Sequence, residues 1–332
     1  MKKWKLLTVL MAVMLLVLAA CSSKDEAETD QGDSAADNTT EESTGAYPIT
    51  VPGSTYDGTT FEDVTLKAQP KKVVVFDYGF LDTLDALGVE VAGVPQKNLP
   101  SYLSKYADEK YENIGSLKEP DFEALSALNP DIIFISGRQA AAYDELSKIA
   151  PTIYVGVDAA NFMESFKTNT DLAGKIFGKE QEAADEFVAY EAKVEEIKAK
   201  TAASEEKALI VLGNEGSLSA YGPGSRFGVI HDIFGVKAAD ESIEVSTHGS
   251  NASFEYVRKV NPDILFVVDR DAAVNPDGES GTKAAIENEI VAATNAAKNG
   301  KIIYLDPQYW YLSGGGIQSE TAKLDDVLNA FN

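Results

Sequence analysis

Short apolar runs alternate with segments of helical spacing along most of the chain. Runs of strand length lie at about 72–77, 91–95, 131–136 and 152–155, and again at 207–212, 263–268 and 301–305. This alternation predicts α/β units with mainly parallel sheets. Residues 179–203 lack glycine and proline, and apolar side chains recur there at helical spacing: Phe187, Tyr190, Val194 and Ile197. We therefore expect two α/β lobes with mainly parallel sheets, joined by one long helix.

An internal repeat supports the division into two lobes. Residues 121–138 and 253–270 share eight of 18 positions at a constant offset: Phe, Glu, Asn-Pro-Asp, Ile, Phe and a terminal Arg. Each copy predicts a short helix, a turn and a buried strand that ends in a loop with arginine. Ligands of such sheets bind beyond the carboxyl ends of the strands. We therefore expect the binding site in a cleft between the lobes.

The N-terminus has the pattern of an export signal. Lys2, Lys3 and Lys5 precede an apolar run, Leu6–Ala20, that is shorter than the roughly 20 residues of a membrane span. Small residues before Cys21 resemble the lipobox of bacterial lipoproteins, which implies that Cys21 is lipidated; the alternative is a secreted protein with an incidental cysteine. The predicted order is a signal peptide (1–20), the lipidated cysteine with a disordered acidic tether (21–45), an N-terminal lobe (46–160), connecting helices (161–203) and a C-terminal lobe (204–332).

Composition removes several classes of function. With 53 acidic and 29 basic residues, the chain has a net charge of −24, which does not suit the wrapping of nucleic acid. One cysteine and two histidines exclude an internal disulfide, a thiolate metal cluster and a zinc site made of several imidazoles. The nucleophile elbow, the phosphate-binding loop and the H-E-x-x-H motif do not occur. We expect a protein that is not an enzyme.

The chain has only four arginines against 25 lysines. Arg258 lies beside Lys259 in a helix and is expected to be ordinary surface. Arg138 and Arg270 are repeat equivalents that follow strands, and Arg226 lies in the loop YGPGSRFG. Guanidinium groups offer planar, multiple donors, so these three predict a basic pocket for an anionic, oxygen-rich ligand. The alternative is three salt bridges with the abundant carboxylates.

Two further residues offer metal-binding chemistry. His248 lies in STHGSNASF and Tyr309 lies in DPQYWYLSGGG. An imidazole and a phenolate suit a ferric ion whose other ligands are oxygens. The alternatives are a structural histidine and an aromatic packing cluster.

Taken together, these motifs resemble the iron-siderophore-binding proteins of bacterial ABC importers. The repeated F-E…N-P-D…R, the SRFG-x-I-H-D-x-F-G-V stretch, THG and WYLSGGG are most similar to the branch that binds petrobactin-like and enterobactin-type catecholates. The resemblance covers about residues 68–330. It implies a bilobed class III periplasmic-binding-protein fold with a rigid interdomain helix. It also implies a ferric siderophore as the transported ligand, with no intrinsic cofactor.

The resemblance assigns roles to individual residues. Arg138, Arg226 and Arg270 match the arginines that face the ferric catecholate. His248 and Tyr309 match residues that complete the iron shell when a siderophore leaves positions open.

Glu123 and Glu255 are repeat equivalents near the starts of helices. They match glutamates that meet arginines on the permease subunits, and the alternative is a stabilising interaction with the helix dipole. The resemblance thus implies a monomer that is anchored at the extracellular face of the membrane through Cys21 and delivers its ligand to an ABC permease.

Other ligands and classes stay open at this point. Haem, cobalamin or a hydroxamate siderophore would suit the same kind of protein, although three arginines favour a multiply charged anion over a neutral hydroxamate. A siderophore hydrolase would need a nucleophile–base pair that the sequence does not offer. An adhesin would leave the placement of the arginines unexplained.

Overall fold

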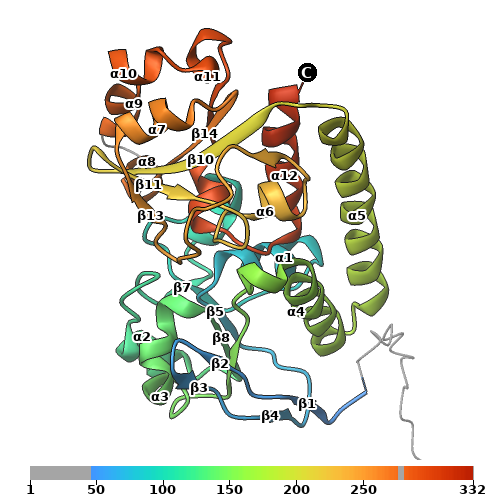
Figure 1. The fold of residues 1–332 in the computed structure, drawn as a ribbon. Helices are drawn as coiled ribbons and strands as arrows, with labels where there is room; N and C mark the ends of the chain where they lie inside the picture. Colours follow the sequence, from blue (N-terminus) through green and yellow to red (C-terminus); the bar gives the residue numbers. More distant parts are fainter. Residues whose placement is uncertain (1–45, 276–279, 332) are drawn as a thin grey trace, which may run out of the picture. The chain divides into compact units, whose positions relative to one another are not determined.

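Two sheets organise residues 46–275 and 280–331, which the computed structural model describes and which belong to one unit, Glu42–Asn332 (Figure 1). In the N-terminal sheet the strand order is β7-β6-β5-β8-β9 and every pairing is parallel. Its strands are β5 (Val73–Val75), β6 (Gly93–Val94), β7 (Glu112–Asn113), β8 (Ile132–Ile135) and β9 (Thr152–Tyr154). All residues of β5 and β8 are buried, as expected for strands covered on both faces.

The C-terminal sheet has the order β13-β11-β10-β14-β15, with β12 also paired to β10. Strands β10, β12, β13, β14 and β15 run in the same direction, whereas β11 runs antiparallel to its neighbours β10 and β13. The fold class expected from the sequence is therefore confirmed. The strands are β10 (Lys207–Asn214), β11 (Ser217–Tyr221), β12 (Lys237–Ala238), β13 (Ser250–Ala252), β14 (Ile264–Asp269) and β15 (Ile302–Leu305).

A short antiparallel extension precedes the first sheet and was not predicted. It pairs β1 with β4 and β2 with β3. Its strands are β1 (Ile49–Val51), β2 (Thr55–Tyr56), β3 (Thr59–Thr60) and β4 (Val64–Leu66). These strands are two or three residues long and rich in threonine, so they lack the apolar runs that reveal the other strands.

The long helix expected over 179–203 is α5, Glu180–Ala202, and the four apolar residues that predicted it are buried. None of the described helices is both long and apolar enough to cross a bilayer. The other α-helices are α1 (Tyr78–Ala86), α2 (Phe122–Leu128), α3 (Tyr143–Leu146), α4 (Phe162–Phe177), α6 (Val229–Asp232), α7 (Phe254–Val260), α8 (Arg270–Val274), α9 (Gly281–Ile286), α10 (Glu289–Ala292), α11 (Asn295–Lys298) and α12 (Ile317–Leu328). Short 3-10 turns are η1 (Ser101–Ala107), η2 (Gly137–Ala142), η3 (Ala159–Asn161) and η5 (Asn329–Phe331), and η4 (Gln308–Leu312) is a π-helical turn.

The internal repeat is one structural unit used twice. Helices α2 and α7 both begin with Phe-Glu behind a side-chain cap, Asp121 in one and Ser253 in the other. Both end at an asparagine in the left-handed region, Asn129 and Asn261, each with φ of 51°, a conformation that asparagine tolerates better than most residues. A buried strand follows each helix, as the repeat predicts.

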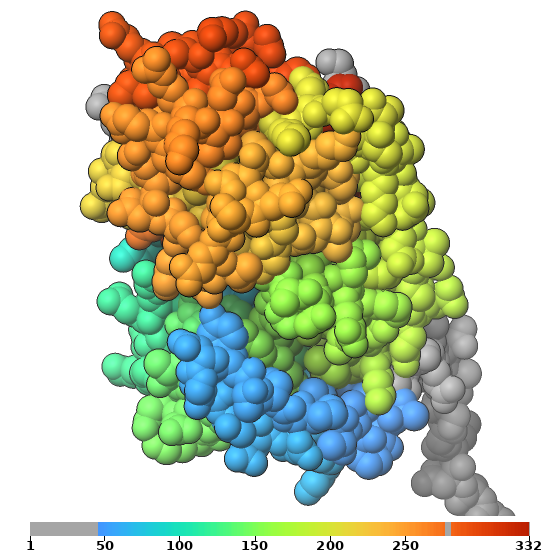
Figure 2. Space-filling model, viewed as in Figure 1, coloured from blue at the N-terminus to red at the C-terminus, as the bar shows by residue number. Residues whose placement is uncertain are grey.

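The lobes meet at more than the connecting helix. A single hydrophobic cluster contains residues of both sheets, and α12 packs against both α1 and α5. The space-filling view shows the N-terminal residues (blue to green) and the C-terminal residues (yellow to red) in contact along a broad boundary (Figure 2). One long helix is therefore an incomplete description of how the lobes are joined.

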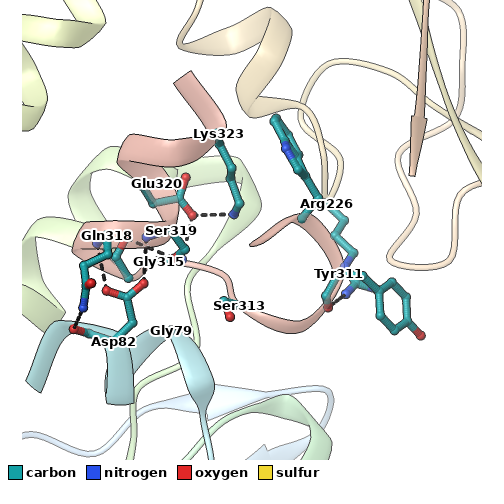
Figure 3. Close-up of polar contacts among 12 residues, drawn as sticks. Gly79, Asp82, Arg226, Tyr311, Ser313, Gly315, Gln318, Ser319, Glu320 and Lys323 are labelled. Carbon is teal, nitrogen blue, oxygen red and sulfur yellow. Dashed lines mark hydrogen bonds and ion pairs between the residues drawn. The ribbon is translucent and has the colours of Figure 1, made fainter. Parts of the chain in front are cut away.

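The centre of this second joint is Asp82 on α1. Its fully buried carboxylate accepts hydrogen bonds from the backbone N–H groups of Gln318 and Ser319, at 2.8 and 2.7 Å, in the first turn of α12 (Figure 3). Burial raises the pKa of Asp82 to about 6, although these hydrogen bonds oppose the shift. Beside it, a β-carbon on Gly79 would lie 2.0 Å from the carbonyl oxygen of Gly314. Glycine is required here because the two backbones touch.

Candidate functional site

The three arginines singled out from the sequence converge on Tyr311. Nη2 of Arg138 and Nη2 of Arg226 donate to the backbone carbonyl oxygen of Tyr311, at 2.8 and 2.7 Å. Nε of Arg270 donates to the phenol oxygen of the same residue at 3.0 Å. Figure 3 shows Arg226 reaching this carbonyl across the turn that carries Tyr311. We call Arg138, Arg226 and Arg270 the arginine triad.

The fold explains why these residues meet. Arg138 lies in η2, directly after β8, and Arg270 is the first residue of α8, directly after β14. Both therefore extend from carboxyl ends of parallel strands, as the repeat predicts. Arg226 lies in the loop between β11 and α6, where Gly224 has a φ of 71° and its N–H donates to Asp232 at 2.6 Å. One arginine comes from the N-terminal lobe and two come from the C-terminal lobe.

In the described part of the chain, no triad arginine forms an ion pair with a carboxylate, although the buried Asp77 interacts electrostatically with Arg138. Every ion pair found among residues 46–275 and 280–331 has a lysine as its cation. The interpretation of the three arginines as structural salt bridges is therefore wrong for the described part of the chain. Arg258, by contrast, is exposed on α7, as expected for ordinary surface.

The charges of the triad act on one another and on Tyr311. Burial lowers the pKa of Arg226, and the positive charge of Arg138 lowers it further. Burial opposes ionisation of the Tyr311 phenol, but Arg226, Arg270 and Arg138 outweigh it and bring its pKa below the ordinary value. The Arg226 guanidinium also lies 4.5 Å from the centre of the Tyr311 ring. The site therefore stabilises negative charge.

The two residues predicted to complete an iron shell lie outside this contact. The Tyr309 ring packs against Tyr102, with 4.8 Å between ring centres, and burial together with Asp306 raises its pKa. His248 is exposed, and its backbone N–H donates to Ser246 Oγ at 3.2 Å. Their roles as iron ligands stay predictions. Groups of three or more His, Cys, Asp or Glu side chains that could hold a metal do not occur among the described residues.

Two residues at the site were missed from the sequence. Tyr311 belongs to the same Tyr-Trp-Tyr run as Tyr309, but residues two apart in a helical turn point in different directions, so only one of them faces the triad. Asn214, the last residue of β10, accepts a hydrogen bond from Nη1 of Arg270 at 2.5 Å. No sequence motif marks it.

Residues 73–309 match the family model described as periplasmic binding protein. The chain belongs to this family, because the match covers well over half of its length. It is 52% identical over 260 residues to the petrobactin-binding protein YclQ of Bacillus subtilis (strain 168), which covers 78% of this chain and 81% of YclQ. It is 35% identical over 269 residues to the ferric-anguibactin-binding protein FatB of Vibrio anguillarum, which covers 79% of this chain and 83% of FatB.

Solved structures agree with the sequence relatives. The crystal structure of YclQ from Bacillus subtilis matches with a TM-score of 0.81 and 48% identity, over 86% of this chain and 99% of that one. The periplasmic catecholate-siderophore binding protein VctP from Vibrio cholerae matches with a TM-score of 0.78 and 35% identity, over 85% of this chain and all of the other (100%). These relatives are named as binding proteins.

Proposed function

We propose that this protein is the siderophore-binding component of an ABC importer and that it captures a ferric catecholate-type siderophore. The observation that carries the proposal is the arginine triad, which three different segments bring together without an ion pair to any carboxylate of the described residues. A ferric tris-catecholate is an anion whose charge is spread over oxygen atoms, and guanidinium groups suit such acceptors. Each contact contributes on the order of 1.5–3 kcal/mol.

The named relatives support the same ligand class. YclQ is named for petrobactin and VctP for catecholate siderophores. A relative at 26% identity is named for iron-hydroxamate, FhuD of Bacillus subtilis. A neutral hydroxamate complex brings no negative charge to balance three unneutralised guanidinium groups, so the triad favours the anionic class.

Removing any member of the triad tests this proposal. Arg138→Ala, Arg226→Ala and Arg270→Ala are each expected to weaken the binding of a ferric catecholate about 10-fold or more, because each loses about 1.4 kcal/mol or more of charge-assisted bonding. Arg258→Ala is the control and is expected to bind as the wild type does. Dissociation constants from fluorescence titration give the answer. Affinities that none of the three changes alters would refute an anion site at the triad.

A second part of the proposal concerns the iron itself. A hexadentate tris-catecholate leaves no position open, whereas a tetradentate bis-catecholate leaves two. His248→Ala and Tyr309→Phe are therefore expected to leave the first ligand's affinity almost unchanged and to weaken the second. Tyr311→Phe is the informative comparison, because Tyr311 is the phenol among the arginines.

The phenolate-to-iron absorption band distinguishes the two tyrosines. If Tyr309 binds iron, the band of the bis-catecholate complex is lost in Tyr309→Phe and kept in Tyr311→Phe. The reverse result would assign the phenolate ligand to Tyr311 and contradict the role of Tyr309.

The remaining part of the proposal is delivery to the permease by a lipid-anchored monomer. Cys21, the expected lipidation site, lies outside the described residues. Glu123 and Glu255 are the second residues of α2 and α7, and both are exposed. In Figure 1 these helices lie on the side opposite to α5. We propose that each of the two glutamates contacts one of the two permease subunits.

The double variant Glu123→Ala/Glu255→Ala is expected to keep its siderophore affinity in solution and to lose iron uptake in cells, because it lacks only the permease contacts. The matched control is Glu186→Ala/Glu191→Ala, which removes the same charge from the exposed face of α5. Labelling of Cys21 with a lipid probe verifies anchoring and equal surface amounts. Normal uptake by the first variant would leave its glutamates with only a helix-terminal role.

A further inference from the structure

Arg270 is held by two acceptors that carry no formal charge in their ordinary states. Its Nη1 donates to Oδ1 of Asn214 at 2.5 Å, and its Nε donates to the Tyr311 phenol oxygen at 3.0 Å. Strands β10 and β14 pair in parallel, with Gly213 opposite Asp269. Asn214 is the last residue of β10 and Arg270 directly follows β14, so the two residues come next to each other at the carboxyl edge of the sheet. The register of the sheet therefore fixes this contact.

The two carboxylates next to Arg270 in the sequence are engaged elsewhere. Asp269 accepts from the backbone N–H of Ala272 at 3.0 Å and from Ser280 Oγ at 2.5 Å. Asp271 accepts from the backbone N–H of Glu215 at 3.0 Å. These bonds cap α8 and tie it to the turn after β10. Neither aspartate forms an ion pair with Arg270.

The other two members of the triad follow the same rule. Arg138 and Arg226 donate to a backbone carbonyl oxygen, which orients them without neutralising them. In a chain with 53 acidic residues, an arginine site without an ion pair to any described carboxylate is a specific arrangement. At Arg270 the acceptor is a side chain, and it is the amide that differs from aspartate only by an NH2 group in place of an oxygen.

We propose that Asn214 is a positioning residue that orients Arg270 while leaving its positive charge available to the ligand. This inference rests on the proposed function. An aspartate at position 214 would accept the same hydrogen bond in the same place, but it would form an ion pair with Arg270 and cancel its charge. The amide thus sets the preference of the site for an anion.

Asn214→Asp separates orientation from charge. The variant keeps the acceptor oxygen. If Asn214 serves only packing or orientation, the variant should bind ferric petrobactin as tightly as the wild type does. If Asn214 leaves the charge of Arg270 available, we expect the affinity of Asn214→Asp to be at least about 10-fold weaker. The loss should be smaller in Asn214→Ala, which keeps the charge of Arg270. The dependence of affinity on salt concentration should also become shallower in Asn214→Asp. Asn299→Asp, at the exposed end of α11, is the matched control for added negative charge.

A ligand-free measurement makes the outcomes distinguishable. Asn214→Asp should raise the midpoint of thermal unfolding in the wild-type background and not in the Arg270→Ala background, because the gain comes from their ion pair. Absence of this coupling overturns the inference. Coupling together with unchanged petrobactin affinity overturns it as well. Coupling in a protein whose wild type binds no ferric catecholate would refute the proposed function, and the ligand role of Asn214 with it.

Discussion

Three guanidinium groups held together in a half-buried site repel one another, and the rest of the structure has to hold them there. Burial, and after it the charge of Arg138, lowers the pKa of Arg226, and the positive charges of the three arginines lower the pKa of Tyr311. A carboxylate would relieve the repulsion but would also compete with an anionic ligand. Carbonyl, phenol and amide oxygens instead orient the groups and leave the charge to the ligand, which is electrostatic preorganisation applied to binding.

The triad is shared between lobes, so the lobes must keep a fixed relation. The joint at Asp82 and the segment Gly314–Gly316, which follows Tyr311, hold the two lobes in this relation. Glu320, which is fully buried, accepts from the N–H of Gly315 at 2.8 Å and from Nζ of Lys323 at 2.6 Å (Figure 3). Buried ion pairs of this kind contribute little net stability because desolvation is costly. The bonds of Glu320 instead fix the segment that carries Tyr311 against α12.

Much of the fold could be predicted because it rests on strong local patterns. The apolar runs gave the strands β5, β8, β10 and β14, and helical spacing without glycine or proline gave α5. The repeat placed Arg138 and Arg270 at equivalent strand ends. The small strands β2, β3, β11 and β13 carry mostly Thr, Ser and other small or polar residues, and their pairing depends on neighbours that a local pattern does not reveal.

The site shows the same limit at the level of single residues. The choice between Tyr309 and Tyr311 depends on a π-helical turn, a rare local geometry often found at functional sites. Asn214 becomes visible only through the register between β10 and β14. Sequence reasoning thus identified charged residues whose type is informative, and it missed the uncharged residues that hold them.

The central claim is that the unneutralised triad selects ligands by charge. The most direct test follows the fluorescence of Trp310 during titration with ferric complexes of different charge. Trp310 is buried and lies directly between Tyr309 and Tyr311 in the sequence, and its indole N–H donates to Asp326 at 2.9 Å. The account predicts that an anionic ferric catecholate binds at least about 100-fold more tightly than a neutral ferric hydroxamate, a difference of about 2.7 kcal/mol. The difference should shrink as salt is added. Equal affinities for the two complexes at low salt would contradict the account.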